Sequence, residues 1–209
     1  MTTASLEQEV FLGLDSAGVM MTPEEFDAIG EDEYDENYRY ELINGVVVVS
    51  PLPSPEETGP NELLGHYLLL YKETHRRGKS LDWTLPQQYV FLKRTRRIAD
   101  RLIWTGLGRQ PNRRSDLPSI AVEFVSRGRR SQKRDYVDKR KDYSKAGIKE
   151  YWIIDRFQRT MTVIRYKSTG EEVIVIRDNE TYEPPFLPGF KVPLADILAA
   201  ADRIAASEE

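Results

Sequence analysis

Residues 119–126 read Ser-Ile-Ala-Val-Glu-Phe-Val-Ser, and a strongly basic segment over residues 127–147 follows them directly. Both faces of the first stretch are apolar, which is typical of a buried central strand. The basic segment is predicted to be helical over residues 132–145, with Gly147 as its stop. A carboxylate inside such a strand is costly unless it binds a partner. Glu123 is therefore expected to lie at least partly inside the protein and to bind something.

The rest of the chain alternates between helix and strand patterns. Asn44-Gly45 is the strongest short turn signal and predicts a β-hairpin over residues 38–50. Helices are also predicted over residues 22–30, 60–77 and 194–206. Strands are predicted over residues 83–92, 97–104, 118–126, 150–155, 160–167 and 171–177. This order predicts an α/β or α+β fold around one sheet, as a single domain over residues 22–209 after a lead-in segment over residues 1–21.

The composition excludes several classes of site. The chain of 209 residues has no cysteine, so disulfides and thiolate metal sites are excluded, and its two histidines make a multi-histidine zinc centre untenable. No apolar run reaches membrane-spanning length, and the N-terminus lacks the basic-then-apolar plan of a signal peptide. We therefore expect a cytoplasmic protein.

The net charge of -4 conceals a strong asymmetry. Residues 1–62 contain fifteen acidic residues and one basic residue, whereas residues 93–149 contain eighteen basic and six acidic residues. Such a basic block is a candidate surface for binding a polyanion. The alternative is a solvated surface whose charge is offset by the acidic N-terminal region. Charge alone leaves both readings open.

Two more acids lie in strand-like surroundings, Glu41 and Asp100. Within residues 98–104, Asp100 alternates with apolar residues, so its side chain is expected to point inward. A divalent cation would remove the cost of burying these acids together with Glu123, and hard oxygen ligands favour Mg²⁺ or Mn²⁺. The alternative is that each acid pairs with an arginine close to it in sequence, namely Arg39, Arg97 or Arg101.

The basic helix offers one lysine to these acids. Lys139 lies three residues after Tyr136 and four before Tyr143, so all three share one helix face. Tyrosines usually face the protein body, which predicts that Lys139 points at the sheet. Its ammonium could then orient a water near the metal. The alternative is a lysine that lies along Tyr143 and keeps its charge in water.

Four motifs recur in the order of a known family. They are Tyr40-Glu-Leu-Ile-Asn-Gly45, Val122-Glu-Phe-Val-Ser126, Lys139-x-x-x-Tyr143-x-x-x-Gly147-Ile-x-Glu150-Tyr-Trp-Ile-Ile-Asp155, and Phe186-Leu-Pro-Gly-Phe190. Over about residues 22–198 the chain resembles the restriction-endonuclease-like family of uncharacterised bacterial proteins, within the PD-(D/E)xK nuclease superfamily. The resemblance implies a restriction-endonuclease-like mixed β-sheet flanked by helices, with strand acids that bind Mg²⁺.

The resemblance also implies roles for individual residues. Asp100 matches the acid of the first half-motif, Glu123 matches the acid of the second, and Glu41 matches an additional upstream glutamate. Lys139 matches a lysine on the following helix. The chain departs from the family pattern at Ala99, where proline is usual, at Val125, which occupies the superfamily's lysine position, and in residues 127–130, where the family commonly has Pro-Ser.

The function expected from the sequence is Mg²⁺-dependent (or Mn²⁺-dependent) hydrolysis of DNA phosphodiester bonds, by a homodimer. Asp100 and Glu123 would hold the metal, and Lys139 would position the attacking water. Glu41 would complete the metal shell or bind a second ion. Backbone phosphates would be contacted by Arg127, Arg129, Arg130, Lys133 and Arg134.

Two other readings are kept open. One is a catalytically inactive nuclease-fold module that binds nucleic acid or a partner protein, which the departures at Val125 and residues 127–130 favour. The other is a self-associating structural protein whose basic residues pair with the acidic N-terminal region. The first predicts polyanion binding at low salt without metal-dependent turnover. The second predicts that any binding to heparin or DNA resin is unaffected when the charges of Arg129 and Arg130 are reversed.

Overall fold

The computed structural model describes residues 10–207, which form two compact units. The first contains the described residues up to Leu52 and the segment Phe91–Arg97, and the second contains Pro53–Val90 and the described residues from Ile98 onward. Residues 1–9 of the expected lead-in segment lie outside the described residues. In the described part of the chain, no helix has the length and apolar character to cross a membrane. A single domain over residues 22–209 stays a prediction.

The first unit contains the predicted hairpin and the predicted short helix. Strands β1 (Tyr38–Ile43) and β2 (Val46–Pro51) pair antiparallel, and Asn44 and Gly45 join them with φ values of 53° and 84°. Such positive φ values are what a tight hairpin turn requires. Helix α1 (Pro23–Ala28) begins with a capping box between Thr22 and Glu25. Two short 3₁₀ turns, Leu14–Ser16 and Glu31–Glu33, complete this unit.

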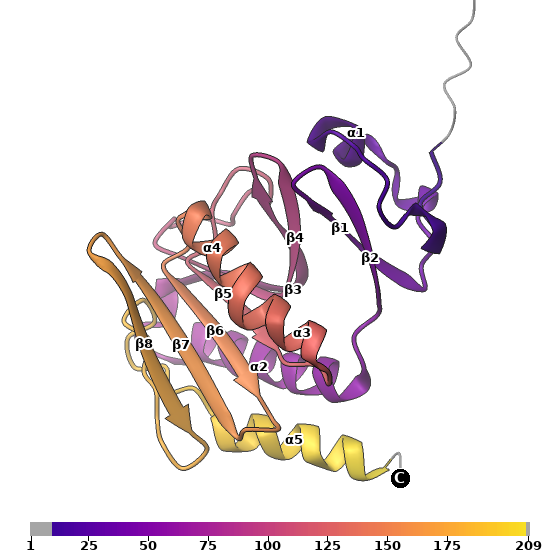
Figure 1. Cartoon of the computed structure of the whole chain (residues 1–209). Helices are drawn as coiled ribbons and strands as arrows, with labels where there is room; N and C mark the ends of the chain where they lie inside the picture. The colour runs from indigo at the N-terminus through magenta and orange to yellow at the C-terminus, as the bar shows by residue number, and fades with distance from the viewer. Residues whose placement is uncertain (1–9, 208–209) are drawn as a thin grey trace, which may run out of the picture. The chain divides into compact units, whose positions relative to one another are not determined.

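The second unit is built on a mixed sheet (Figure 1). Its strands are β3 (Leu81–Leu92), β4 (Thr95–Thr105), β5 (Ile120–Phe124), β6 (Glu150–Asp155), β7 (Thr160–Lys167) and β8 (Gly170–Arg177), of which β3 and β4 each have a few residues in the first unit. The β5–β6 pair is parallel, whereas β4–β5, β6–β7 and β7–β8 are antiparallel. The predicted mixed sheet is thereby confirmed.

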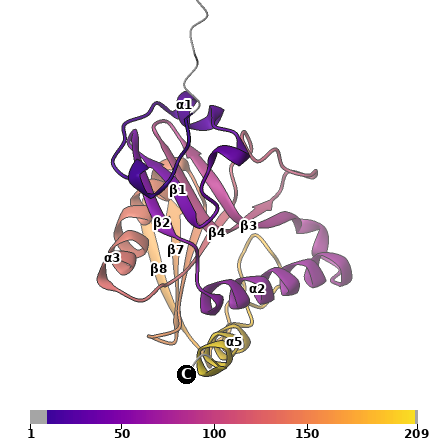
Figure 2. The same cartoon turned by 90° about the vertical axis from the view of Figure 1, so that its right-hand side faces the viewer.

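Helices flank both faces of this sheet (Figures 1 and 2). Helices α2 (Pro55–Thr74) and α5 (Leu194–Ser207) cover one face, and a short 3₁₀ turn, Gly78–Ser80, follows α2. The other face carries α3 (Arg129–Lys133), a π-helical segment η4 (Arg134–Lys139) and α4 (Arg140–Ala146) in direct succession. The sheet thus separates an apolar layer from a layer that contains the basic helical region.

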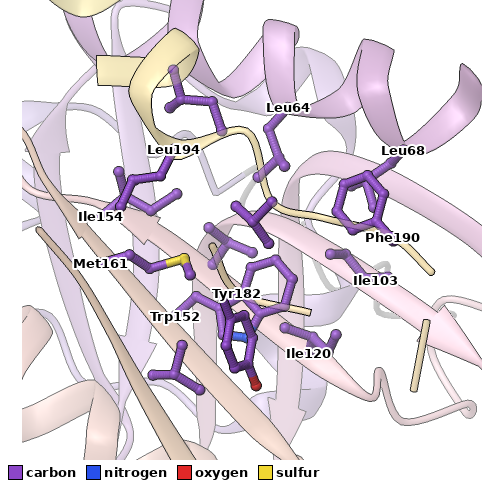
Figure 3. Close-up of a cluster of buried hydrophobic side chains, with 14 of the residues drawn as sticks. Leu64, Leu68, Ile103, Ile120, Trp152, Ile154, Met161, Tyr182, Phe190 and Leu194 are labelled. Carbon is purple, nitrogen blue, oxygen red and sulfur yellow. The ribbon is translucent and has the colours of Figure 1, made fainter. Parts of the chain in front are cut away.

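The apolar core lies between the sheet and helices α2 and α5 (Figure 3). Leu64 and Leu68 reach it from α2, and Trp152 packs in it edge-on against Tyr182 with ring centroids 6.0 Å apart. Strand β5 sends Ile120, Val122 and Phe124 to this side. Because side chains alternate along a strand, Glu123 must point to the opposite face. Packing of the apolar side chains of β5 in the core therefore places Glu123 on the other face of the sheet.

Three predicted boundaries were wrong. Helix α2 begins at Pro55, because Ser54-Pro55 already provides a favourable helix start. Pro60 lies inside the helix, near its N-terminus, where its missing N–H removes only one backbone hydrogen bond. The central strand is shorter than predicted, Ile120–Phe124. The basic helix begins at Arg129 and contains the π-helical segment, for which the sequence carries no periodic signal.

Candidate functional site

Asp100, Glu123 and Lys139 converge in the second unit, and we call this group the acid–lysine site. The Nζ atom of Lys139 lies 2.6 Å from Oε2 of Glu123 and donates a 2.8 Å hydrogen bond to the Ile98 carbonyl. Only 3% of Lys139 and 1% of Glu123 is exposed. The predicted inward direction of Lys139 is confirmed, and the alternative of a solvent-directed lysine is wrong.

The pairing of β4 with β5 places Asp100 beside Glu123. The two strands are antiparallel with Arg101 opposite Val122, and Oδ2 of Asp100 accepts a 2.8 Å hydrogen bond from the backbone N–H of Phe124. Asp100 is only 4% exposed, so its predicted inward direction is also confirmed. The backbone of β5 therefore holds the first acid next to the second.

The surroundings of Glu123 favour its neutral form. The pKa of Glu123 is raised to about 8, because burial and the nearby charges of Asp100 and Asp135 raise it by more than Lys139 lowers it. Its second oxygen, Oε1, accepts a 2.8 Å hydrogen bond from the hydroxyl of Tyr143. Both oxygens of this carboxylate are thus held by side chains of the basic helical region.

Asp135 is a buried acid that our sequence reasoning missed. It lies in η4 one turn before Lys139, whose Nζ is 4.0 Å from its Oδ1, and Nε of Arg134 donates to the same oxygen at 3.1 Å. In the described part of the chain, Oδ2 of Asp135 has no hydrogen-bond partner although it is buried. Burial raises the pKa of Asp135, partly offset by Lys139 and Arg134. The four-residue spacing to Lys139 was the one available signal.

Gln87 is a second residue that the sequence did not reveal. Its Nε2 donates a 3.1 Å hydrogen bond to Oδ1 of Asp100, from a backbone whose φ is 49° within strand β3. No motif or periodicity marks this position. Both oxygens of Asp100 therefore accept hydrogen bonds, one from a side-chain amide and one from the backbone of β5.

Glu41 belongs to the first unit, where an arginine partners it. Glu41 is 4% exposed, and its Oε2 lies 3.6 Å from the guanidinium of Arg97. An arginine thus lies beside this acid, but it is Arg97, which is distant from Glu41 in sequence, whereas the alternative supposed an arginine close in sequence. Arg101 instead donates to the side chain and carbonyl of Asn61, on the face of the sheet that α2 covers. The role of Glu41 in a metal shell stays a prediction.

The basic residues expected to contact DNA lie around α3. The side chains that are exposed are Arg127, Arg129, Arg130 and Lys133. Arg134 is only half-exposed and binds Asp135, so its charge is partly committed to the buried acid. Val125, at the position of the superfamily's lysine, is buried and apolar. The lysine of this site therefore comes from η4 and not from β5.

The donor set suits a cation that keeps much of its water. Among residues 10–207, no three His, Asp or Glu side chains form a group arranged to hold a metal ion. Mg²⁺ is commonly held by one or two carboxylates, with water and substrate phosphate oxygens as its other ligands. Asp100, Glu123 and Asp135 are three buried carboxyl groups beside two cations, Lys139 and Arg134, so negative charge is in excess where all three acids are ionised. A hard divalent cation fits that excess.

The second unit thus combines a mixed sheet with two strand acids and a helical lysine on one of its faces. The chain belongs to the Uma2 family, described as "Putative restriction endonuclease", which matches residues 23–196. The predicted family is confirmed. The chain is also similar to the crystal structure of "a putative nuclease belonging to DUF820" from Anabaena variabilis, with a TM-score of 0.67 and 16% identity, over 87% of this chain and 99% of that one. This likeness shows the fold alone. No curated protein matches the chain.

Proposed function

We propose that this protein is a metal-dependent endonuclease that hydrolyses DNA phosphodiester bonds with Mg²⁺ or Mn²⁺. The observation that carries the proposal is the 2.6 Å contact between Lys139 and Glu123, beside an Asp100 that is anchored on β5. Asp100, Glu123 and Lys139 come from separate parts of the sequence, and burying their charges together costs free energy. A role in function would explain why this cost is kept. Membership of a nuclease-like family supports the same reading.

Each residue of the acid–lysine site has a proposed role. Asp100 and Glu123 would hold the cation, which when bound would supply Lewis-acid polarisation of a phosphate oxygen. Lys139 would orient the attacking water and offset the negative charge that develops on the phosphate in the transition state. Tyr143 and the Phe124 N–H hold the two carboxylates in place, so little reorganisation is needed.

The exposed arginines around α3 would bind the DNA backbone. Arg127, Arg129 and Arg130 are exposed, and contacts of this kind give affinity that depends on salt and little on sequence. Charge reversal at Arg129 and Arg130 should weaken binding to unrelated duplexes equally. It should also flatten the dependence of the affinity on salt concentration, by about one unit of log–log slope per lost phosphate contact. Recognition of one particular duplex by the wild type would contradict this role.

Nicking of supercoiled plasmid DNA tests the proposal directly. With Mg²⁺ or Mn²⁺, the wild type should nick, and Asp100→Asn, Glu123→Gln and Lys139→Met should each lower the rate at least ~100-fold. Lys141→Met is the matched control, since Lys141 is exposed on α4 two residues beyond Lys139. Undiminished cleavage by both acid variants would end the proposal.

The second candidate is a nuclease-fold module that binds DNA without cutting it. Val125 favours this reading, as does a Glu123 whose two oxygens already accept hydrogen bonds. It predicts retention on DNA at low salt, no Mn²⁺ binding in calorimetry and no nicking. Mn²⁺ binding by the wild type that is lost in Glu123→Gln would decide for the enzyme without requiring the right substrate.

A further inference from the structure

Strand β3 contains a bend that costs free energy. Of the described non-glycine residues with a positive φ, Asn44 and Arg159 lie in hairpin turns, whereas Gln87 lies inside a strand, with a φ of 49°. The left-handed region is unfavourable for a residue such as glutamine, and such conformations persist only where the surroundings hold them. A bend of this kind in a strand commonly redirects a side chain.

The neighbouring residues hold the bend in place. Pro86 precedes it and has no backbone N–H to give to the sheet. The carboxamide of Gln88 donates to the carbonyls of Pro86 and Gln87, at 2.9 and 3.2 Å. Gln88 in turn accepts a 3.1 Å hydrogen bond from Arg113. The carbonyls of Pro86 and Gln87 are thus satisfied by a neighbouring side chain.

The bend places the Gln87 amide against the acid–lysine site. Its Nε2 binds Oδ1 of Asp100 at 3.1 Å, while the Phe124 N–H binds Oδ2 at 2.8 Å. Two donors on different oxygens fix both the position and the plane of the carboxylate. A lysine at position 87 would neutralise Asp100 and compete with a cation, and a glutamate would repel it. A neutral amide orients the carboxylate and leaves its charge available.

We infer that Gln87 is a positioning residue that orients Asp100 for a divalent cation. This inference rests on the proposed function, because it assumes that Asp100 holds a metal. Residues that hydrogen-bond a metal ligand from outside typically change metal affinity or activity by about 10–100-fold when they are removed. The strained backbone at Gln87 is then the structural cost of that orientation.

Gln87→Asn and Gln87→Gly separate this role from a merely structural one. Asparagine and glycine both tolerate the left-handed region, but asparagine is one methylene too short for the contact and glycine has no amide. We expect each variant to bind Mn²⁺ about 10–100-fold more weakly in titration calorimetry. Their midpoints of urea unfolding should stay close to that of the wild type, because relief of the backbone strain offsets the lost hydrogen bond to Asp100.

Gln158→Asn is the matched control. Gln158 also donates its amide to a buried aspartate, Asp155, at 3.0 Å, but Asp155 lies outside the acid–lysine site. This variant should keep the Mn²⁺ affinity of the wild type. Wild-type affinity in Gln87→Asn and Gln87→Gly would overturn the inference and leave the proposed function standing. A wild type that binds no Mn²⁺ would overturn both.

Discussion

Lys139→Met should destabilise the protein by an amount that depends on pH. Methionine fills nearly the same space but leaves Glu123 and the Ile98 carbonyl without the ammonium that lies 2.6 and 2.8 Å from them. Where Glu123 is ionised, removal of one partner of a buried pair costs about 3–5 kcal/mol. Burial raises the pKa of Glu123 to about 8, so at acidic pH the carboxyl is neutral. At acidic pH the substitution therefore removes only hydrogen bonds, and the free energy of unfolding should fall by about 1–3 kcal/mol.

Urea unfolding followed by circular dichroism at about pH 6 and about pH 9 measures both losses, on either side of the Glu123 pKa. The free energy of unfolding should fall more in Lys139→Met at the higher pH. Lys141→Met, the exposed neighbour on α4, should stay within about 0.5 kcal/mol of the wild type at both. In a Glu123→Gln background the pH dependence of the Lys139→Met effect should vanish. An equal loss at the two pH values would refute the claim that this lysine compensates a buried carboxylate.

Three further predictions concern the wild-type pH profile and the buried residues. The pKa of Glu123 is raised from 4.5 to about 8, so between these pH values the folded protein holds one proton more than the unfolded chain. The stability that this proton contributes is complete below about pH 4.5 and is lost as the pH rises to about 8. Unfolding free energies should thus decline with pH more in the wild type than in Glu123→Gln, and parallel profiles would contradict this. Glu150→Ala removes a buried carboxylate that accepts from three side chains, and urea titration should show a loss of about 3–5 kcal/mol with nicking per folded molecule unchanged. Leu68→Ala opens a cavity under α2 and should cost about 2–5 kcal/mol in the same titration; a loss below about 1 kcal/mol would mean that the core repacks there.

Local signals in the sequence were sufficient for much of the fold. The capping box at Thr22 and the turn at Asn44-Gly45 act within a few residues, so these elements formed where they were predicted. The inward direction of Asp100 followed from strand alternation, and that of Lys139 followed from the helix face that it shares with Tyr143. Such patterns can be read directly because one period fixes every side chain of an element.

Other parts of the site depend on contacts between elements that are distant in sequence. Asp135 looked like one more charge on a basic helix, and only the fold shows that it is buried within 4.0 Å of Lys139. Gln87 carries no local signal in the sequence. Its strained backbone is held by the hydrogen bonds of Gln88 and by the contact of its own amide with Asp100, which is distant in sequence.

The sequence by itself determined the family, the mixed sheet and the acids that we propose as ligands of a divalent cation. The tertiary structure decided which acids share a face and which groups partner them: Glu123 binds Lys139 and Tyr143, whereas Glu41 lies beside Arg97. The physical reason is that the free energy of a buried charge depends on groups brought within a few ångströms by folding, and spacing along the chain does not specify them.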